Sequence, residues 1–335
     1  MRKTAGILAA AAIAASALIA APAHADSTTL ASGGSSFSAK MFTTCAASYT
    51  DAAVTYTSSS SGTGRTNFAN GTFDFAGSDG AFAATDKFPA GTAYVPVLGG
   101  PISFIYNVDG VKNLRLDAAT IGKIFLGTIK TWDDAAIKKL NPGVKLPSVA
   151  ITPEYRNAKS GTNGNMSGYL AANTTGWKAD QTWTVATGMA TPAGNGGATS
   201  ANVVANVKAT ANSIGYVDLA DAVAAGLPYA SVKNSAGQFV KPTTAAAAKF
   251  LAGQTVESNG FITIDWAKKV PGGYNASLIT YAVVDTAAAK KGAAVKGFLT
   301  YVLNSCVPAN ATKLGYVSLT GAISAKAKAV VASIK

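Results

Sequence analysis

Residues 150–162 read AITPEYRNAKSGT. The first part, Ala150 to Arg156, has the character of a short strand. The second part is a polar loop that reaches Ser160, Gly161 and Thr162 directly before a helical stretch. A strand, a Ser/Gly loop and a helix in this order make one unit of an α/β protein, so this segment indicates the fold class.

The same alternation of short apolar strands and Ala-rich helical stretches continues in both directions along the chain. We expect strands at residues 53–57, 73–77, 102–106, 150–156, 213–218 and 278–284, and helices at 37–48, 117–125, 133–140 and 286–303. This pattern predicts an α/β protein with mostly parallel sheets.

The length of 335 residues favours two domains. Residues 94–101 and 271–274 combine strand-like and Gly/Pro character, and we interpret them as paired crossings between two lobes. The hinges are expected near residues 95–101 and 271–278. Lobe one then comprises residues 26–97 and 278–335, and lobe two comprises residues 98–277.

The first 25 residues have the layout of a secretory signal peptide. Arg2 and Lys3 precede an apolar run at 5–20, and small residues flank the expected cleavage after residue 25. The run is shorter than the roughly 20 residues needed to span a bilayer, and no later segment replaces it. We therefore expect an exported, soluble protein, periplasmic or, in a host without an outer membrane, extracellular or associated with the cell wall.

The composition of the mature chain excludes several kinds of site. His24 is the single histidine and lies in the predicted signal peptide, so no Ser/His/Asp or Cys/His nucleophilic site and no His-bearing metal site can form. The adjacent Asp133 and Asp134 stand where acids suit the first turn of a helix. We expect no catalytic residue, no metal and no cofactor.

Basic residues exceed acidic ones, 28 to 16, and removal of Arg2 and Lys3 leaves a net charge of +10. The lysines occur singly or in pairs, without the interleaved aromatic residues of a nucleic-acid-binding stripe, so no nucleic acid partner is expected. A dispersed positive field still raises the local concentration of small anions.

Three Ser/Thr/Gly clusters each precede a helical stretch, at residues 33–37, 60–64 and 160–162. A helix start has unpaired backbone N–H groups and the positive end of the helix dipole, and hydroxyl side chains add further donors. One such cluster is usually a plain helix cap. Three of them, the last preceded by Arg156, predict converging donors around a tetrahedral oxyanion.

Asp79, at the end of the strand expected at 73–77, is the acidic residue of this group. A carboxylate repels an anion unless the anion carries a proton to donate. Asp79 therefore favours protonated phosphate over sulfate, whereas Asp74, at the start of the same strand, is interpreted as structural.

Several motifs of the chain resemble those of a known family. Residues 124–137 read IFLGTIKTWDDAAI and continue to LNPG at 140–143, and DF at 74–75, SD at 78–79, GG at 196–197 and SIGYV at 213–217 occur with family-like spacing. These motifs are similar to those of the phosphate-binding proteins of high-affinity phosphate ABC transporters, over nearly all of the mature chain.

The resemblance implies a two-lobed periplasmic binding protein of type II, the Venus-flytrap kind, in which each lobe is a mostly parallel sheet flanked by helices. It implies a monomer that closes on inorganic phosphate, delivers it to a membrane ABC permease and has no catalytic activity. The phosphate-binding residues that it places on this chain are Ser36, Phe37, Ser61, Asp79, Arg156, Ser160, Gly161 and Thr162.

Two positions depart from the family pattern. The family has Asp-Gly where this chain has Ala158 and Lys159, and that Asp helps to hold the arginine. Lys159 is interpreted as a solvated lysine or a cation at the edge of the cleft. Arg65, just inside the helix after the second loop, is a weaker candidate for additional charge at the site.

The two cysteines, Cys45 and Cys306, have no metal-ligand spacing. In an oxidising compartment we expect them to form one long-range disulfide, and the alternative is two buried thiols. The resemblance places this bridge between the first helix of lobe one and the end of the helix expected at 286–303.

Three alternatives remain open from the sequence. The first is a binding protein for another tetrahedral oxyanion, and the second is a secreted phosphatase that uses the same pocket. The third is a surface-displayed protein that has kept the fold and lost the site.

Overall fold

The computed structural model describes residues 28–335. The predicted signal peptide, residues 1–25, lies outside the described residues. The strands are β1 (Thr29–Ser35), β2 (Ala53–Ser59), β3 (Phe75–Ser78), β4 (Thr92–Asn107), β5 (Arg115–Leu116), β6 (Thr152–Arg156), β7 (Asn195–Gly197), β8 (Ser213–Asp218), β9 (Ser231–Lys233), β10 (Phe239–Val240), β11 (Thr255–Val256), β12 (Ile262–Thr263), β13 (Ser277–Asp285) and β14 (Val317–Ser318).

Helices alternate with these strands along the chain, as predicted. They are α1 (Ala39–Ala47), α2 (Ser61–Ala69), α3 (Ala118–Phe125), α4 (Ala135–Leu140), α5 (Gly161–Asn173), α6 (Trp183–Thr187), α7 (Ser200–Ala209), α8 (Leu219–Ala225), α9 (Thr244–Leu251), α10 (Gly292–Tyr301), the π-helical turn η1 (Val302–Cys306), α11 (Val307–Asn310) and α12 (Gly321–Ala332).

The main sheet has nine strands in the order β2-β1-β3-β13-β4-β8-β6-β7, and β14 also pairs with β4. The pairs β1–β2, β1–β3, β6–β7 and β6–β8 are parallel, whereas β13 and β4 run antiparallel to their neighbours. The predicted α/β class with mostly parallel strands is confirmed at each end of this sheet.

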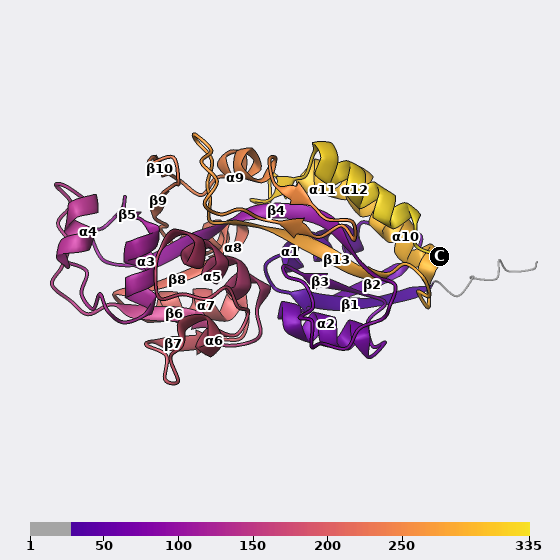
Figure 1. The fold of residues 1–335 in the computed structure, drawn as a ribbon, viewed down its shortest axis with the longest axis horizontal. Helices are drawn as coiled ribbons and strands as arrows, with labels where there is room; N and C mark the ends of the chain where they lie inside the picture. The colour runs from indigo at the N-terminus through magenta and orange to yellow at the C-terminus, as the bar shows by residue number, and fades with distance from the viewer. Residues whose placement is uncertain (1–27) are drawn as a thin grey trace, which may run out of the picture.

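Strand β4 joins the two ends of the sheet. Its residues from Thr92 to Pro101 pair with β13, and its residues from Ile102 to Asn107 pair with β8. In Figure 1, β4 runs between two groups of elements that lie side by side along the long axis of the molecule. The lobe boundaries given above stay a prediction, and we use lobe one and lobe two for the two sets of residues that they define.

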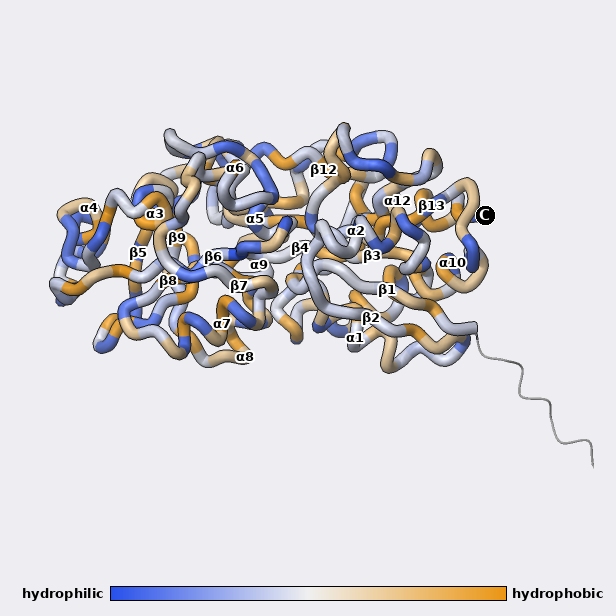
Figure 2. The backbone as a smooth tube through the Cα atoms, turned by 90° about the horizontal axis from the view of Figure 1, so that it is seen from below, coloured by the Kyte–Doolittle hydropathy of each residue, from blue (hydrophilic) through white to orange (hydrophobic). Residues whose placement is uncertain are grey.

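Helices cover both faces of the sheet in each lobe. Figure 2 shows α1 and α2 on opposite sides of β1 and β3, and α5 and α7 on opposite sides of β6 and β8. In β13, Ile279 and Val283 belong to a core cluster with Phe68 of α2, whereas Ala282 belongs to a second cluster with Phe42 of α1. Alternate residues of a strand point to opposite faces, which explains why apolar residues of β13 are buried on both of its faces.

One expectation about the elements is wrong. Residues 286–291 are not helical: the Asp285 carboxylate accepts hydrogen bonds from the backbone N–H groups of Ala287 and Ala288, and α10 begins only at Gly292. The segment 94–101, interpreted as a crossing between the lobes, lies inside the long strand β4, where it pairs with β13 on one side and, at Leu98 and Gly99, with β14 on the other. Pairing with distant segments thus makes a Gly/Pro-rich stretch part of a strand.

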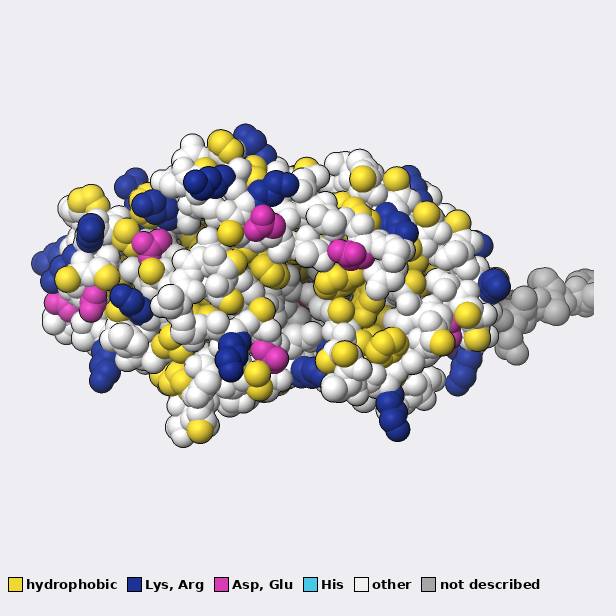
Figure 3. Space-filling model, in the orientation of Figure 1, with side chains coloured by type: hydrophobic (Ala, Val, Ile, Leu, Met, Phe, Trp, Pro, Cys, Tyr) yellow, Lys and Arg dark blue, Asp and Glu magenta, His cyan; other side chains and the backbone are white. Residues whose placement is uncertain are grey.

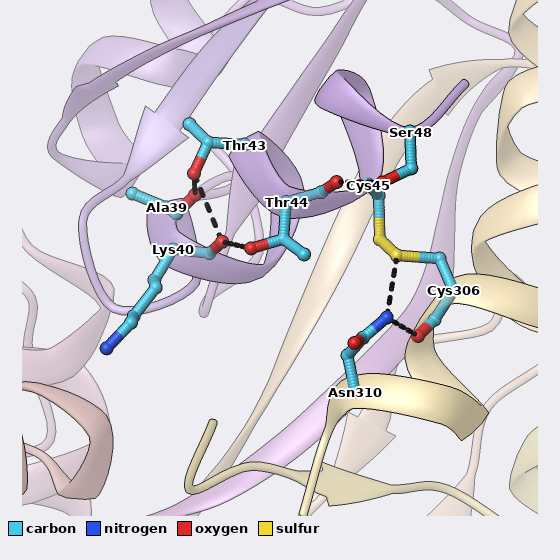
Figure 4. The surroundings of a disulfide bond; sticks show 8 residues. All are labelled: Ala39, Lys40, Thr43, Thr44, Cys45, Ser48, Cys306 and Asn310. Carbon is cyan, nitrogen blue, oxygen red and sulfur yellow. Dashed lines mark hydrogen bonds between the residues drawn. A yellow bond between two sulfur atoms is a disulfide. The ribbon is translucent and has the colours of Figure 1, made fainter. Parts of the chain in front are cut away.

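The predicted disulfide between Cys45 and Cys306 is present and joins residues 261 positions apart. It connects α1 to η1, as Figure 4 shows, and both cysteines are buried. The side-chain amide of Asn310 donates to the carbonyl oxygen of Cys306 at 2.9 Å. The bridge therefore links the C-terminal helices to the first helix of lobe one.

Within residues 28–335, no helix is both long and apolar enough to cross a membrane. The same residues contain no group of three or more Asp, Glu, Cys or His side chains with the arrangement of a metal site. Of the adjacent acids, Asp134 caps α4 by accepting from the N–H of Ala136 at 2.8 Å, and Asp133 pairs with Lys138.

Candidate anion-binding site

The candidate site lies where the parallel strands end. Parallel strands of both lobes lead, at their carboxyl ends, into loops that carry candidate residues or their neighbours. These strands are β1, β2 and β3 in lobe one and β6 and β7 in lobe two. Ligands of open α/β sheets bind at these ends. On the face drawn in Figure 3 the surface is hollowed between the two halves of the molecule, and Lys and Arg side chains are scattered rather than gathered into one stripe.

Helices start from these loops, and hydroxyl residues cap three of the starts. Ser60 caps α2 by accepting from the N–H of Thr63, Ser160 caps α5 by accepting from Asn163, and Thr199 caps α7. Helix α1 begins two residues after Phe37. The positive ends of four helix dipoles therefore lie at the site, which favours an anion.

The structure brings all of the predicted phosphate-binding residues into one buried region between the lobes. All eight residues are buried, and the seven that have side chains are each at most 8% exposed. They are Ser36, Phe37, Ser61 and Asp79 from lobe one, and Arg156, Ser160, Gly161 and Thr162 from lobe two.

Arg156 is a buried cation without a carboxylate partner. Its Nη1 donates to the hydroxyl oxygen of Ser36 at 3.1 Å, and its Nε and Nη2 donate to the carbonyl oxygen of Ala198 at 3.1 and 2.7 Å. Among the described residues, no acidic side chain lies within ion-pair distance of it. Burial lowers the pKa of the Arg156 guanidinium, because removal from water disfavours the charged form.

The Ala198 carbonyl takes the holding role that the resemblance assigns to the missing aspartate. It fixes the orientation of Arg156 through two hydrogen bonds but brings no formal charge. The positive charge of the guanidinium is therefore left for a bound anion to neutralise, since a buried charge is stable only when it is paired.

Asp79 is the acidic group at the centre of the site and is 3% exposed. Its Oδ1 accepts from Thr280 and Ser35 at 2.7 Å each, and its Oδ2 lies 3.4 Å from the hydroxyls of both Ser61 and Thr162. Burial raises the pKa of Asp79, and the hydrogen bonds from Thr280 and Ser35 oppose that rise. Thr162 belongs to lobe two, so this carboxylate already contacts both lobes.

Gly161 has no room for a side chain. A Cβ atom there would lie 2.5 Å from the Ser61 hydroxyl and 2.7 Å from the Cβ of Asp79. Glycine thus allows the first turn of α5 to approach lobe one closely, which brings backbone N–H groups near the centre of the site.

Arg65 is buried, but its hydrogen bonds point away from the predicted ligand donors. Its Nη1 donates to the hydroxyl of Ser78 and the carbonyl of Gly80, and its Nη2 donates to the side chain of Gln181 in lobe two at 2.6 Å. The structure therefore places Arg65 as a contact between the lobes, beside the site rather than in it.

Lys159 forms a second contact between the lobes. Its Nζ lies 3.2 Å from both carboxylate oxygens of Asp86, and its carbonyl oxygen accepts from the N–H of Gly62 at 2.9 Å. The side chain is 44% exposed. Lys159 is thus partly solvated and also paired across the edge of the cleft.

The sequence analysis missed three residues of this region. Ser35 and Thr280 bond to Asp79, and Ser200, the first residue of α7, reaches Ser36 through its N–H at 3.0 Å and its hydroxyl at 3.1 Å. The signal for Ser200 was present, because residues 196–200 form another Gly/Ser/Thr cluster before a helix. Thr280 lies within a buried apolar strand, where no local pattern marks it.

A family model described as a PBP superfamily domain matches residues 20–305. Among curated proteins, the chain is 37% identical over 215 residues to the phosphate-binding protein PstS 3 of Mycobacterium leprae, an alignment that covers 61% of this chain and 57% of that protein. It is 38% identical over 161 residues to the phosphate-binding protein PstS of Pasteurella multocida, covering 47% and 44%. The chain thus aligns with 57% of the length of the first relative and 44% of the length of the second.

Solved structures with similar folds cover nearly the whole chain. A high-affinity periplasmic phosphate-binding protein, PfluDING, bound with phosphate, has a TM-score of 0.72 at 20% identity and covers 90% of this chain and 93% of its own. A phosphate-binding protein from Stenotrophomonas maltophilia has a TM-score of 0.69 at 19% identity, with 90% and 94% covered. At these identities the likeness establishes the fold.

Proposed function

The chain belongs to the PBP superfamily, and we propose that it is an exported solute-binding protein that captures inorganic phosphate between its two lobes and delivers it to a membrane ABC permease. The observation that carries this proposal is the presence of buried Asp79 and buried Arg156, which form no ion pair with each other, among neutral hydroxyl and N–H donors. The names of the relatives support it, since each is a phosphate-binding protein.

The charges of the site fit an anion that still carries a proton. Arg156 supplies a positive charge that no acidic side chain neutralises by contact. Asp79 would repel a fully ionised anion, but an ionised carboxylate accepts a hydrogen bond from the P–OH group of phosphate. Sulfate has no proton to give near neutral pH, so the same carboxylate disfavours it.

Binding replaces the water around the anion with fixed donors. The hydroxyls of Ser36, Ser61 and Thr162 and the N–H groups at the helix starts supply neutral hydrogen bonds, and Arg156 supplies charged ones. Because these groups come from both lobes, the anion stabilises the closed arrangement, and a permease can recognise that closed shape. We propose that the chain acts as a monomer without catalytic activity, cofactor or nucleic acid partner.

The test is calorimetric titration of the mature protein with phosphate and with sulfate at neutral pH. We expect phosphate to bind far more tightly than sulfate. In Asp79→Asn we expect phosphate affinity to fall, because the amide accepts poorly from P–OH. The difference between the phosphate and sulfate affinities also narrows, because the amide no longer repels sulfate. Equal affinity for both anions in the unaltered protein contradicts the phosphate assignment and favours a site for another tetrahedral oxyanion.

A secreted phosphatase is the second candidate for such a pocket. It needs a nucleophile with a base, or metal ligands, and residues 28–335 offer neither a histidine nor a cluster of metal-ligating side chains. Incubation with a chromogenic phosphate ester, with and without divalent metal ions, is expected to show no release of phosphate. Steady turnover would replace the binding proposal by a catalytic one.

A further inference from the structure

Thr280 connects strand β13 to the acidic group of the site. Its side chain is fully buried, and its Oγ1 donates to Oδ1 of Asp79 at 2.7 Å, although the two residues are 201 positions apart. The ladder between β13 and β4 is irregular between Thr280 and Tyr281. The hydroxyl thus comes from a strand that pairs with both β3 and β4, next to the point where the chain returns from lobe two.

The two oxygens of the Asp79 carboxylate have different surroundings. Oδ1 is held by the short bond from Thr280 and shares the Ser35 hydroxyl with Oδ2. Apart from the Ser35 hydroxyl, which lies 2.7 Å from both oxygens, Oδ2 has longer contacts of 3.4 Å each with Ser61 and Thr162, which are both candidate ligand donors. Oδ1 is therefore the anchored oxygen, and Oδ2 is the oxygen that faces the ligand donors.

We infer that Thr280 is a positioning residue that sets the selectivity of the site: its hydroxyl holds Asp79 in the ionised form with Oδ2 directed at the ligand. The inference rests on the proposed function, because it concerns how the same site distinguishes a proton-carrying oxyanion from one without a proton. Thr280 itself does not contact the anion in this scheme.

Among the described residues, hydroxyl groups rather than charged groups donate the hydrogen bonds that hold the Asp79 carboxylate. Arg156 and Arg65 are the cations whose fields act on it, and both remain charged at neutral pH. Tyr56, Tyr281 and Tyr316 are the phenols near it, and burial raises the pKa of each, so they stay neutral. Neither arginine forms a hydrogen bond with the carboxylate, whereas Thr280 and Ser35 do.

Loss of the Thr280 hydroxyl shifts the balance toward protonated Asp79. Burial already raises the pKa of this carboxyl, and removal of the bond from Thr280 raises it further. A protonated Asp79 donates a hydrogen bond and no longer repels an anion, so it accommodates sulfate. Sulfate affinity therefore increases as the pH falls through the pKa of Asp79, and in the variant this increase begins at a higher pH.

The experiment compares Thr280→Val, which has nearly the same shape but no hydroxyl, with Thr280→Ser, which keeps the hydroxyl. Ser277→Ala is the matched control, because Ser277 is a fully buried residue of the same strand whose hydroxyl bonds to the Tyr274 carbonyl instead. Affinities for phosphate and sulfate are measured from about pH 4.5 to 8.5, across the range in which a raised carboxyl pKa falls. The Asp79 carboxyl is also titrated by NMR in the protein without anion.

We expect Thr280→Val to reduce the phosphate-to-sulfate affinity ratio about tenfold at neutral pH, the size of effect typical of one hydrogen bond to a charged group. The rise in sulfate affinity moves to higher pH, and Thr280→Ser and Ser277→Ala behave like the unaltered protein. A Thr280→Val protein in which both affinities change by the same factor and the NMR titration of Asp79 does not move would overturn the inference.

The NMR titration separates this inference from the proposed function. If the protein binds neither anion, the phosphate proposal fails, yet the titration of Asp79 in Thr280→Val still reports whether Thr280 holds the carboxylate ionised. If phosphate binds well but Asp79 titrates identically in both proteins, the function stands and the role of Thr280 is refuted.

Discussion

At the scale of single residues, the charge of Arg156 is the main electrostatic feature of the site. A backbone carbonyl holds this guanidinium, where the resemblance leads one to expect an aspartate. An aspartate neutralises much of the charge that it orients, whereas a carbonyl orients the group and leaves its charge unpaired. With Ala158 and Lys159 at these positions, the guanidinium has an orienting partner but no carboxylate beside it, and we expect its charge to be available to a bound anion.

A substitution at Ser200 directly tests whether α7 contributes a hydroxyl to phosphate binding. Its N–H and hydroxyl both reach the hydroxyl of Ser36, which also accepts from Arg156. Ser200→Ala removes the hydroxyl and keeps the N–H, so we expect a loss of about 0.5–1.5 kcal/mol, or roughly 2- to 13-fold in phosphate affinity. Calorimetric titration measures this loss.

Ser213→Ala is the matched control for Ser200→Ala. Ser213 is equally buried in lobe two, but its hydroxyl bonds to the carbonyls of Val207 and Thr210, away from Ser36. Its removal is expected to lower thermal stability without a change in phosphate affinity. Identical affinities in the Ser200 and Ser213 variants would show that the Ser200 hydroxyl does not contribute to binding.

The sequence analysis singled out those candidate residues whose signal is local. Ser61 and Ser160 stand at helix starts that their own neighbours define, and Arg156 ends a recognisable strand. Thr280 could not be predicted, because its partner Asp79 is distant in sequence and only the pairing of β13 with β3 brings the two residues together.

At the scale of elements, local patterns predicted the short strands well and failed where a single carboxylate decides. Strand β8 occupies the predicted residues 213–218, and each of its residues is buried. The helix expected at 286–303 begins late, since the Asp285 carboxylate binds two N–H groups of the segment that follows it. Sequence periodicity does not register a turn of this kind.

The disulfide gives a prediction at the same scale. It closes a loop of 261 residues between α1 and η1. Replacement of both cysteines by alanine removes this constraint on the unfolded chain, so we expect the free energy of unfolding to fall by about 2–5 kcal/mol. Urea unfolding followed by tryptophan fluorescence measures the change.

Phosphate affinity serves as the internal control for the disulfide variant. Both cysteines lie in segments assigned to lobe one, and their side-chain hydrogen-bond partner is Asn310, which is not a predicted ligand residue. The affinity is therefore expected to stay within about twofold, a difference of roughly 0.4 kcal/mol. Thiol titration of the unfolded, unreduced protein should find no reactive thiol. Two reactive thiols, or unchanged stability without the cysteines, would contradict the bridge as a stabilising element.

At the scale of the whole molecule, four polar contacts join the lobes at the edge of the cleft. They are the ion pair between Lys159 and Asp86, the bond from Gly62 to the Lys159 carbonyl, the bond from Arg65 to Gln181, and the bond from Gln181 to the Ala81 carbonyl. We call them the edge contacts. Closure thus depends on groups beside the ligand as well as on the ligand itself, and each edge contact that exists only in the closed form adds to the apparent affinity.

The ion pair is the edge contact that can be removed without a change in packing. Lys159→Gln keeps the backbone carbonyl that binds Gly62 and removes the charge that faces Asp86. Partly exposed ion pairs contribute about 0.2–1 kcal/mol, so phosphate affinity is expected to fall roughly 1.4- to 5-fold at low ionic strength. The pKa of Asp86 is lowered overall: burial alone would raise it, but the hydrogen bonds from the Ala83 N–H and from Lys159 outweigh burial. Asp86 therefore stays ionised down to a pH below its ordinary pKa, and the ion pair is lost only in acid.

Salt distinguishes this effect from a general loss of positive charge near the site. In about 1 M salt the Debye length is near 3 Å, and the difference between Lys159→Gln and the unaltered protein is expected to shrink. Lys138→Gln is the control, because Lys138 pairs with Asp133 at the same distance of 3.2 Å but within lobe two, so closure neither forms nor breaks it. Equal losses of affinity in both variants would assign the effect to net charge, whereas a loss confined to Lys159→Gln shows that this ion pair favours the closed form.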